Sequence, residues 1–294
     1  MNVAIFAKTD KGKHYNQNED ACSFCCDLSH PEWGKQDAMA KLGSCGCLLA
    51  VADGMGGAKA GEIASNLAIE TIKRKFSDIE ALREAIASDI DILRFLQTVF
   101  EEANSVIKQY ALGHIEAMGL GTTLVVCWII DDKAYIAWCG DSRCYTFNPY
   151  FGLTALTKDH SYVQELINKG ELTEEEALTH PESNIITKGL GDLNIDTPAE
   201  TTIYSIQPDD AFLLCSDGLS GYCDKKTIEK SLKANYPDLK TCCNNLIGLA
   251  LDTGGYDNIS VAIASLSENA IISNKTRLLS LLKKFMLKLF KRQP

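Results

Sequence analysis

The sequence predicts a domain that combines β-strands with α-helices. Apolar residues recur at helical spacing over about residues 61–76 and 88–112. Short apolar runs bounded by glycine and acidic residues are typical of strands, as at about 122–130, 134–139 and 143–147. With 294 residues and 46% hydrophobic content, the chain is long enough to bury a large core.

The other elements follow in order. Residues 1–8 are mostly apolar and have no basic region ahead of the apolar segment, so we expect a first strand rather than a signal peptide. Asp131-Asp132 predicts a turn between the first two central strands. Two later helices are expected near 225–235 and 239–251, ahead of a last strand. No repeat or long linker interrupts this pattern.

Acidic corners stand beside several of the apolar runs. Each corner pairs an aspartate with glycine or asparagine: Asp53-Gly54, Gly140-Asp141, Asp217-Gly218 and Asp257-Asn258. A single pair of this kind is usually a turn. The runs before Asp53 and Asp217, however, look like buried strands that stop at an acid. With Glu19-Asp20, these corners are interpreted as carboxylates aimed into one shared site.

Carboxylates that converge in a low-dielectric site repel one another, so positive charge must hold them. No cluster of lysine or arginine accompanies these acids in the sequence. Hard divalent cations that take oxygen ligands, Mg²⁺ or Mn²⁺, are therefore the expected counter-charge.

The chain resembles the metal-dependent serine/threonine protein phosphatases of the PPM (type 2C) family in their bacterial form. Eight segments stand in the family's order and together span residues 1–267. They are Asn18-Glu19-Asp20-Ala21, residues 51–57 with 61–65, Gly121-Thr122-Thr123, Gly140-Asp141-Ser142-Arg143, residues 156–161, His180-Pro181 with 184–187, residues 215–219, and residues 255–261. One such motif is weak, but eight colinear ones are specific.

The resemblance implies an α+β fold, a four-layer α-β-β-α sandwich in which two antiparallel sheets are flanked by helices. It places the metals in a cleft at one end of that sandwich. The catalytic domain would cover residues 1–268, and residues 269–294 would form a separate tail. Within the domain, residues 168–188 resemble the flap beside the family's active site.

The resemblance also implies a centre of two Mn²⁺ or Mg²⁺ ions and leaves a third ion open. The residues that match its metal-binding positions are Glu19, Asp20, Asp53, Gly54, Asp141, Asp217 and Asp257. Asp53 would bridge both ions, Gly54 would offer its carbonyl oxygen, and Asp141 would join Asp217 at the third ion. Catalysis is assigned to the carboxylates of Asp53, Asp217 and Asp257. Asn258 is expected to support Asp257.

The expected reaction is hydrolysis of phosphoserine and phosphothreonine in phosphorylated proteins. Two divalent ions reverse the field that would repel a phosphomonoester, lower the pKa of a bridging water, and hold the attacking and leaving oxygens in line. Such hydrolysis needs no covalent phosphoenzyme, so no serine or cysteine is assigned as a nucleophile. Two alternatives stay open: a catalytically weak or inactive phosphoprotein-binding module, and a phosphatase of non-protein phosphoesters.

The sequence departs from the family at two places. Many members carry a phosphate-binding arginine where this chain has Tyr15, which leaves Tyr15 and His14 as candidate phosphate contacts. Members also often have a histidine where this chain has Met55 or Ala58, so the general acid is unassigned. His160 is expected to be structural, ahead of a helix that Ser161 caps.

The twelve cysteines, without a signal peptide, fit a reducing cytoplasm, where we expect a monomeric protein. Their spacing lacks the two-residue spacer of zinc sites. No apolar run reaches the ~18–20 residues of a membrane span. The net charge of −10 disfavours a nucleic-acid partner.

The C-terminal tail differs in composition from the rest of the chain. Residues 271–294 hold seven basic residues and no acidic residue, on an amphipathic pattern. Removing these seven from the 29 basic residues leaves 22 against 39 acids, so the body carries −17 and the tail +7. Three interpretations stay open: docking on the acidic body, contact with an anionic membrane at its inner face, or contact with a partner protein.

Overall fold

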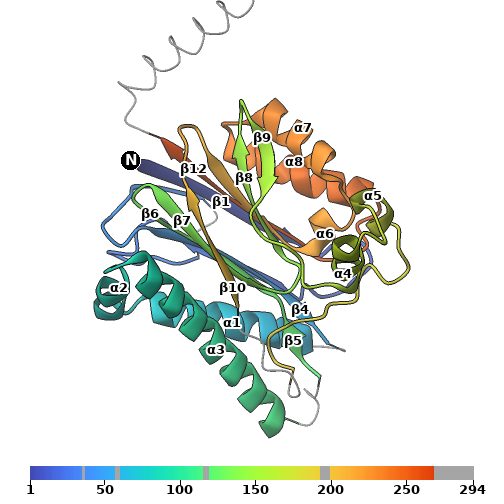
Figure 1. Cartoon of the computed structure of the whole chain (residues 1–294), viewed down its shortest axis with the longest axis horizontal. Coiled ribbons are helices and arrows are strands. Elements are labelled where there is room, and N and C mark those ends of the chain that lie inside the picture. The colour runs from blue at the N-terminus through green and yellow to red at the C-terminus, as the bar shows by residue number, and fades with distance from the viewer. Residues whose placement is uncertain (35–36, 57–59, 115–118, 193–198, 268–294) are drawn as a thin grey trace, which may run out of the picture.

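The fold consists of two β-sheets packed face to face between two layers of helices (Figure 1). It is seen in a computed structural model of the chain, which describes residues 1–34, 37–56, 60–114, 119–192 and 199–267. The predicted tail, together with Gly57 and Ala58, lies outside the described residues. No helix in the described part is long and apolar enough to cross a membrane.

The strands form two antiparallel sheets. The first has the order β3-β1-β12-β11-β8-β9 and the second β10-β7-β6-β4-β2, with β5 paired to β4. Their bounds are β1 Asn2–Asp10, β2 Asp20–Cys25, β3 Asp37–Lys41, β4 Cys47–Met55, β5 Gly121–Thr122, β6 Leu124–Ile130, β7 Lys133–Cys139, β8 Arg143–Asn148, β9 Gly152–Ala155, β10 Glu200–Ser205, β11 Ala211–Cys215 and β12 Ile259–Ser267.

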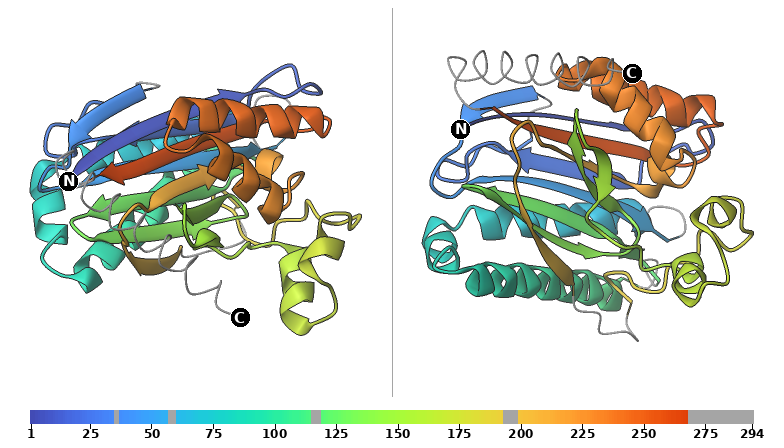
Figure 2. Two further views of the ribbon diagram at one scale, coloured as in Figure 1. Left: turned by 90° about the horizontal axis from the view of Figure 1, so that it is seen from above. Right: turned by 45° about the horizontal axis from the view of Figure 1, so that its top comes forward.

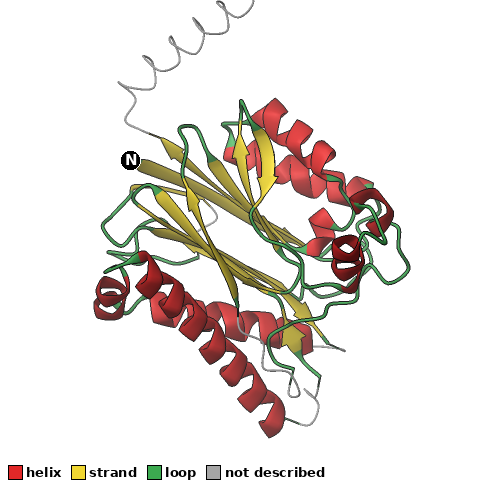
Figure 3. Ribbon diagram, viewed as in Figure 1, coloured by secondary structure: helices red, strands yellow, loops and turns green. Residues whose placement is uncertain are grey.

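Helices cover the outer face of each sheet (Figure 3). Their bounds are α1 Ala60–Phe76, α2 Ile79–Ala85, α3 Asp89–Gly113, α4 Tyr162–Lys169, α5 Glu174–Ala177, α6 Asp217–Ser220, α7 Lys225–Asn235 and α8 Leu239–Asp252. The helices α1–α3 lie under the second sheet, and α7 with α8 lie over the first (Figure 1). In both turned views, α4 and α5 stand apart from these layers at one end of the sandwich (Figure 2).

Three buried apolar layers hold the four structural layers together. One lies between the two sheets and includes Val3, Leu49 and Phe212, and the other two lie between each sheet and its helices. Alternating residues of a strand point to opposite faces, so neighbouring Leu48 and Leu49 of β4 enter different layers. The predicted α+β sandwich is confirmed.

Most predicted elements agree with the structure to within about two residues. Ser161 caps α4 as expected, because its side chain accepts a hydrogen bond from the Gln164 N–H. The twelve cysteines are all unbridged, and eleven of them are buried as small apolar side chains.

Two strand predictions were wrong in detail. The strand expected over 122–130 is broken at Thr123, whose backbone N–H donates to the carbonyl of Asp53 over 2.8 Å. The strand before Asp53 does not stop at the acid but continues to Met55. Its last two residues pair with β5, which lengthens the strand past the carboxylate.

Trp128 should be a main anchor of the layer under the second sheet. Its ring is fully buried against Phe76, with ring centroids 4.9 Å apart, and its indole N–H donates to the carbonyl of Cys45. We expect Trp128→Ala to lower the free energy of unfolding by about 3 kcal/mol, measured by denaturant titration. Trp33→Ala removes a partly exposed indole and should cost about 1 kcal/mol. Equal losses of unfolding free energy in the two variants would contradict a main role for Trp128 in this layer.

Candidate metal centre

The acidic site begins with two carboxylates on neighbouring strands. Asp20 of β2 and Asp53 of β4 are directly opposite one another in the antiparallel register. Residues paired in this way have Cβ atoms about 4.5–5.5 Å apart, on the same face of the sheet. Pairing between segments 33 positions apart therefore brings together two acids that the sequence separates.

Glycine at position 54 lets three segments meet behind Asp53. A Cβ atom on Gly54 would lie 2.1 Å from the carbonyl oxygen of Gly61 and 2.6 Å from that of Glu19. The Gly54 N–H instead donates to the Glu19 carbonyl over 3.2 Å. Any side chain at this position would force apart the start of α1 and the Glu19 segment, both of which border the site.

Asp217 enters the site from the other sheet, at the start of α6. The preceding Ser216 donates its hydroxyl to Asp20 Oδ2 over 2.7 Å, which links the two sheets directly. The same hydroxyl oxygen accepts the N–H of Ser260 in β12. Gly218 is needed here too, because a Cβ atom would lie 1.9 Å from the Asn258 carbonyl oxygen.

Asn258 connects the Asp257 segment to the Glu19 segment. Its side-chain oxygen accepts the Glu19 N–H over 2.7 Å, and its amide donates to the carbonyls of Lys11 and Gln17. Its own backbone N–H donates to Asp257 Oδ1 over 2.8 Å. Asn258 thus contacts the Glu19 segment through its side chain and Asp257 through its backbone, and so connects two acidic residues that lie far apart in the sequence.

Asp141 is buried in the corner after β7. Its neighbour Ser142 shares a 2.7 Å hydrogen bond with the Thr123 hydroxyl, whose oxygen also accepts the Asp53 N–H. His160 braces the same corner, since its backbone N–H donates to the Gly140 carbonyl and its Nδ1 accepts the Gly140 N–H. These contacts fit the structural role expected of His160.

Most of these acids open onto one cavity of about 700 Å³. Its lining includes Glu19, Asp53, Gly54, Asp217, Asp257 and Asn258. Tyr15 also lines it, whereas His14 is not among the lining residues and instead stacks on Tyr256. Asn184 and Ile186 line it from the segment predicted as a flap. Asp20 and Asp141 are buried beside the cavity rather than on its surface.

The acids disfavour one another's charge. Burial raises the pKa of Asp53 well above its usual value, and the carboxylates of Asp20 and Asp217 raise it further. Burial likewise raises the pKa of Asp20 to about 7, although hydrogen bonds from serine hydroxyls oppose the shift. The pKa of Asp257 rises to about 6, through burial and the charge of Asp217. This crowding of buried carboxylates disfavours their ionised form and is relieved by a proton or by a cation.

The donor set fits a hard divalent cation. Asp20, Asp141 and Asp217 each keep one buried carboxylate oxygen, Oδ1, without a hydrogen-bond partner. Buried acceptors of this kind are rare unless a proton or an ion occupies them. Within the described residues, no three His, Cys, Asp or Glu side chains are close enough to hold a metal by themselves. The site is thus a field of oxygens around a cavity rather than a closed cage.

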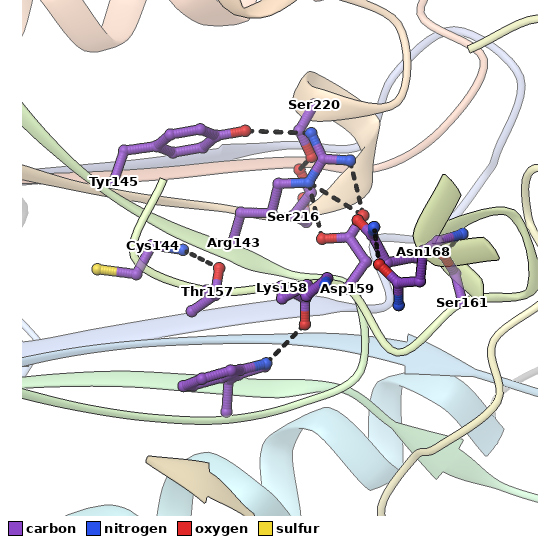
Figure 4. Close-up of polar contacts among 12 residues, drawn as sticks. Arg143, Cys144, Tyr145, Thr157, Lys158, Asp159, Ser161, Asn168, Ser216 and Ser220 are labelled. Atoms are coloured by element: carbon purple, nitrogen blue, oxygen red, sulfur yellow. Dashed lines mark hydrogen bonds and ion pairs between the residues drawn. The ribbon is translucent and has the colours of Figure 1, made fainter. Parts of the chain in front are cut away.

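The sequence showed no cluster of lysine or arginine beside the acids, but one basic side chain, that of Arg143, does lie near them. Arg143 of β8 extends its guanidinium between β8 and α6, where Nε and Nη2 donate to the Asp159 carboxylate and Nη1 to the Tyr145 hydroxyl (Figure 4). Its positive charge lowers the otherwise raised pKa values of Asp141 and Asp217. In the sequence, only the opposite charges of Arg143 and Asp159, sixteen positions apart, indicated that these two side chains could pair.

Arg143 is expected to hold this corner of the site together. Arg143→Met would leave Asp159, which is 11% exposed, without its charge partner and should lower the free energy of unfolding by about 2–3 kcal/mol. Denaturant titration would measure the loss. The double variant Arg143→Met/Asp159→Leu removes both charges and should recover at least half of it. A double variant no more stable than the single one would contradict the pairing.

Comparison with known proteins gives a consistent result. A family model described as Protein phosphatase 2C matches residues 32–252. The serine/threonine phosphatase stp of Listeria monocytogenes serotype 4b is 35% identical over 216 residues, which are 74% of this chain and 83% of that protein. The protein phosphatase PhpP of Streptococcus pneumoniae serotype 2 is 36% identical over 228 residues, 75% of this chain and 86% of its own.

Solved structures show the same likeness. The Mycobacterium tuberculosis serine/threonine phosphatase PstP/Ppp superposes with a TM-score of 0.75 at 30% identity, over 91% of this chain and all of that chain. A structure of the PstP catalytic domain in complex with two manganese ions superposes with a TM-score of 0.73, also at 30% identity, over 91% of this chain and all of its own.

Proposed function

The chain belongs to the protein phosphatase 2C family, and from this premise we propose that it removes phosphate from phosphoserine and phosphothreonine of proteins. The single observation that carries the proposal is the convergence of Asp53, Asp217 and Asp257 on one cavity. The cofactors are two Mn²⁺ or Mg²⁺ ions, as in the related structure that holds two manganese ions.

Asp53 would contact both ions, with Glu19, Asp20, Asp217, Asp257 and the Gly54 carbonyl as further ligands. Asp141 would join Asp217 at a third ion. The ions would supply a positive field and an activated water for in-line attack on phosphorus. Ser216 holds Asp20 in place, and Asn258 holds Asp257 beside the Glu19 segment. Asn184 and Ile186 line the cavity from the segment predicted as a flap.

The substrate class can be tested directly. We expect the purified full chain with Mn²⁺ to release phosphate from a phosphothreonine peptide with a kcat/KM at least about 10-fold above that for sugar phosphates or nucleoside monophosphates, because remote contacts contribute to transition-state binding. Phosphate release from each compound at equal concentration is the measurement. A preference for the small phosphoesters would support a non-protein substrate instead.

Tyr15 distinguishes this chain from relatives that carry a phosphate-binding arginine. Tyr15 lines the cavity, and the carboxylates of Asp257 and Glu19 raise the pKa of its phenol, so the side chain stays neutral near the substrate. We expect Tyr15→Arg to raise kcat/KM for p-nitrophenyl phosphate about 10-fold, by adding a bidentate phosphate contact.

Tyr15→Lys is the matched control for this variant. It adds the same charge without the planar guanidinium group. The logarithm of kcat/KM for p-nitrophenyl phosphate should therefore rise by less than half as much as in Tyr15→Arg. If both variants stay at the wild-type rate, phosphate does not approach position 15. A wild type without activity that becomes active on Tyr15→Arg would instead favour the phosphoprotein-binding alternative.

A further inference from the structure

Three tyrosines are exposed around one side of the acidic cavity. Tyr15, Tyr222 and Tyr256 are 48%, 41% and 51% exposed, although each is large enough to bury most of its ring in a core. They come from three separate segments: the loop after β1, the turn after α6 and the loop before β12. We call these three residues the aromatic rim.

Two residues of the rim are in ring contact, and the third lies in the cavity lining. The rings of Tyr222 and Tyr256 have centroids 5.6 Å apart, and the other neighbour of Tyr256 is the His14 ring, stacked at 4.9 Å with planes 20° apart. Tyr15 belongs to the cavity lining.

The position of the rim fits a substrate side chain rather than a second domain. A substrate whose phosphate lies in the cavity must extend its neighbouring residues over the edge, where Tyr15 lines the cavity and Tyr256 directly precedes the lining residue Asp257. Exposed aromatic side chains beside a functional cavity commonly anchor a binding partner. Their separation from the hydrophobic core means that they add little to packing inside the fold.

The chemistry of the rim favours a cation. The face of a tyrosine ring is electron-rich and attracts guanidinium and ammonium groups. Around it, the chain up to residue 270 carries a net charge of −17, so a basic peptide is drawn to this protein and an acidic one is repelled. Arginine combines charge with a flat, weakly hydrated group that stacks on aromatic rings better than lysine does.

We propose that the aromatic rim binds an arginine side chain next to the phosphorylated residue of the substrate, and so selects phosphoproteins with a basic residue beside the phosphate. This specificity rests on the proposed phosphatase function; Tyr15 also lines the catalytic cavity, whereas Tyr222 and Tyr256 are not among the residues assigned to hydrolysis. Tyr222 is the most suitable residue to test, because it is not among the proposed metal-binding residues and does not adjoin one in sequence.

The test compares two phosphonate peptides, which carry a non-hydrolysable analogue of phosphothreonine flanked by either arginine or alanine. Their affinity for the Mn²⁺-loaded full chain is measured by fluorescence anisotropy at 0.15 M salt. The arginine peptide should bind the wild type about 5–10-fold more tightly. Tyr222→Ala should reduce that ratio to below about 2-fold, whereas Tyr222→Phe, which keeps the ring, should retain it.

Two further variants make the result decisive. Phe151→Ala removes an 84% exposed ring from the β8–β9 turn, at the top of Figure 1 and away from α6, and should keep the wild-type ratio. Tyr256→Ala should lower the ratio even if Tyr222→Ala does not fold. Equal affinity of the wild type for both peptides, or an unchanged ratio in folded Tyr222→Ala, would overturn the proposal.

Hydrolysis of p-nitrophenyl phosphate, measured in parallel, separates this inference from the proposed function. That substrate has no residues beyond the phosphoester and cannot reach the rim through a side chain. Wild-type turnover of it with no preference between the peptides would reject the rim and keep the phosphatase. A peptide preference without any turnover would keep the rim as a recognition surface and reject the phosphatase.

Discussion

Asp53→Asn is expected to lower kcat/KM for a phosphothreonine peptide by about 10³-fold. Asp53 lies opposite Asp20, faces the cavity and is the acid proposed to contact both ions. Asparagine has nearly the same shape, so the backbone contacts with Thr123 should survive while the negative charge is lost. Steady-state phosphate release with saturating Mn²⁺ is the measurement.

Asp131→Asn is the matched control for this substitution. Asp131 is exposed in the turn between β6 and β7, with φ of 51°, a conformation that asparagine also adopts readily. Its activity should equal that of the wild type. An Asp53→Asn protein that is folded and retains more than a tenth of the activity would show that the charge of Asp53 is not needed.

In the absence of metal, Asp20→Asn is expected to stabilise the protein at pH 8 by about 3–4 kcal/mol. The folded-state pKa of Asp20, about 7, lies above its ordinary value of 3.8, so the folded state holds this proton more tightly than the unfolded state. The stabilising proton is fully present below about pH 4 and is lost as the pH rises through 7. Asparagine keeps an acceptor for the Ser216 hydroxyl without acquiring a charge.

The difference in unfolding free energy between wild type and Asp20→Asn should depend on pH and on Mn²⁺. The free energies of unfolding of wild type and Asp20→Asn, measured by urea titration in EDTA, should be similar at pH 4.5 and diverge up to pH 8. Mn²⁺ should then stabilise the wild type more than the variant, by about 2–3 kcal/mol at a concentration near 100 Kd. A variant less stable than the wild type at pH 8 in EDTA would refute the unfavourable burial of this charge.

Local pattern predicted the secondary structure well because the helices and strands of this fold are strongly periodic. The helices over 225–235 and 239–251 were placed within about one residue. Long-range contacts produced the errors. Thr123 leaves its strand because its hydrogen bonds go to Asp53 and Ser142 instead.

The acids of the site were predictable as a set, but not their supporting contacts. Asp53, Asp141, Asp217 and Asp257 each stand next to glycine or asparagine and beside an apolar run, which is a local signal. The register that sets Asp20 opposite Asp53 depends on the pairing of β2 with β4, which the sequence does not state. The same holds for the Arg143–Asp159 pair and for the meeting of Tyr222 with Tyr256.

The most direct test of the central claim is the dependence of turnover on metal. Hydrolysis of p-nitrophenyl phosphate and of a phosphothreonine peptide by the full chain would be measured with Mn²⁺, with Mg²⁺ and with EDTA, beside Asp53→Asn. We predict turnover with either ion, none in EDTA, recovery when the ion is restored, and turnover about 10³-fold lower in the variant. Undiminished turnover in EDTA, or none from folded protein that has bound Mn²⁺, would contradict a hydrolytic metal centre built on these carboxylates.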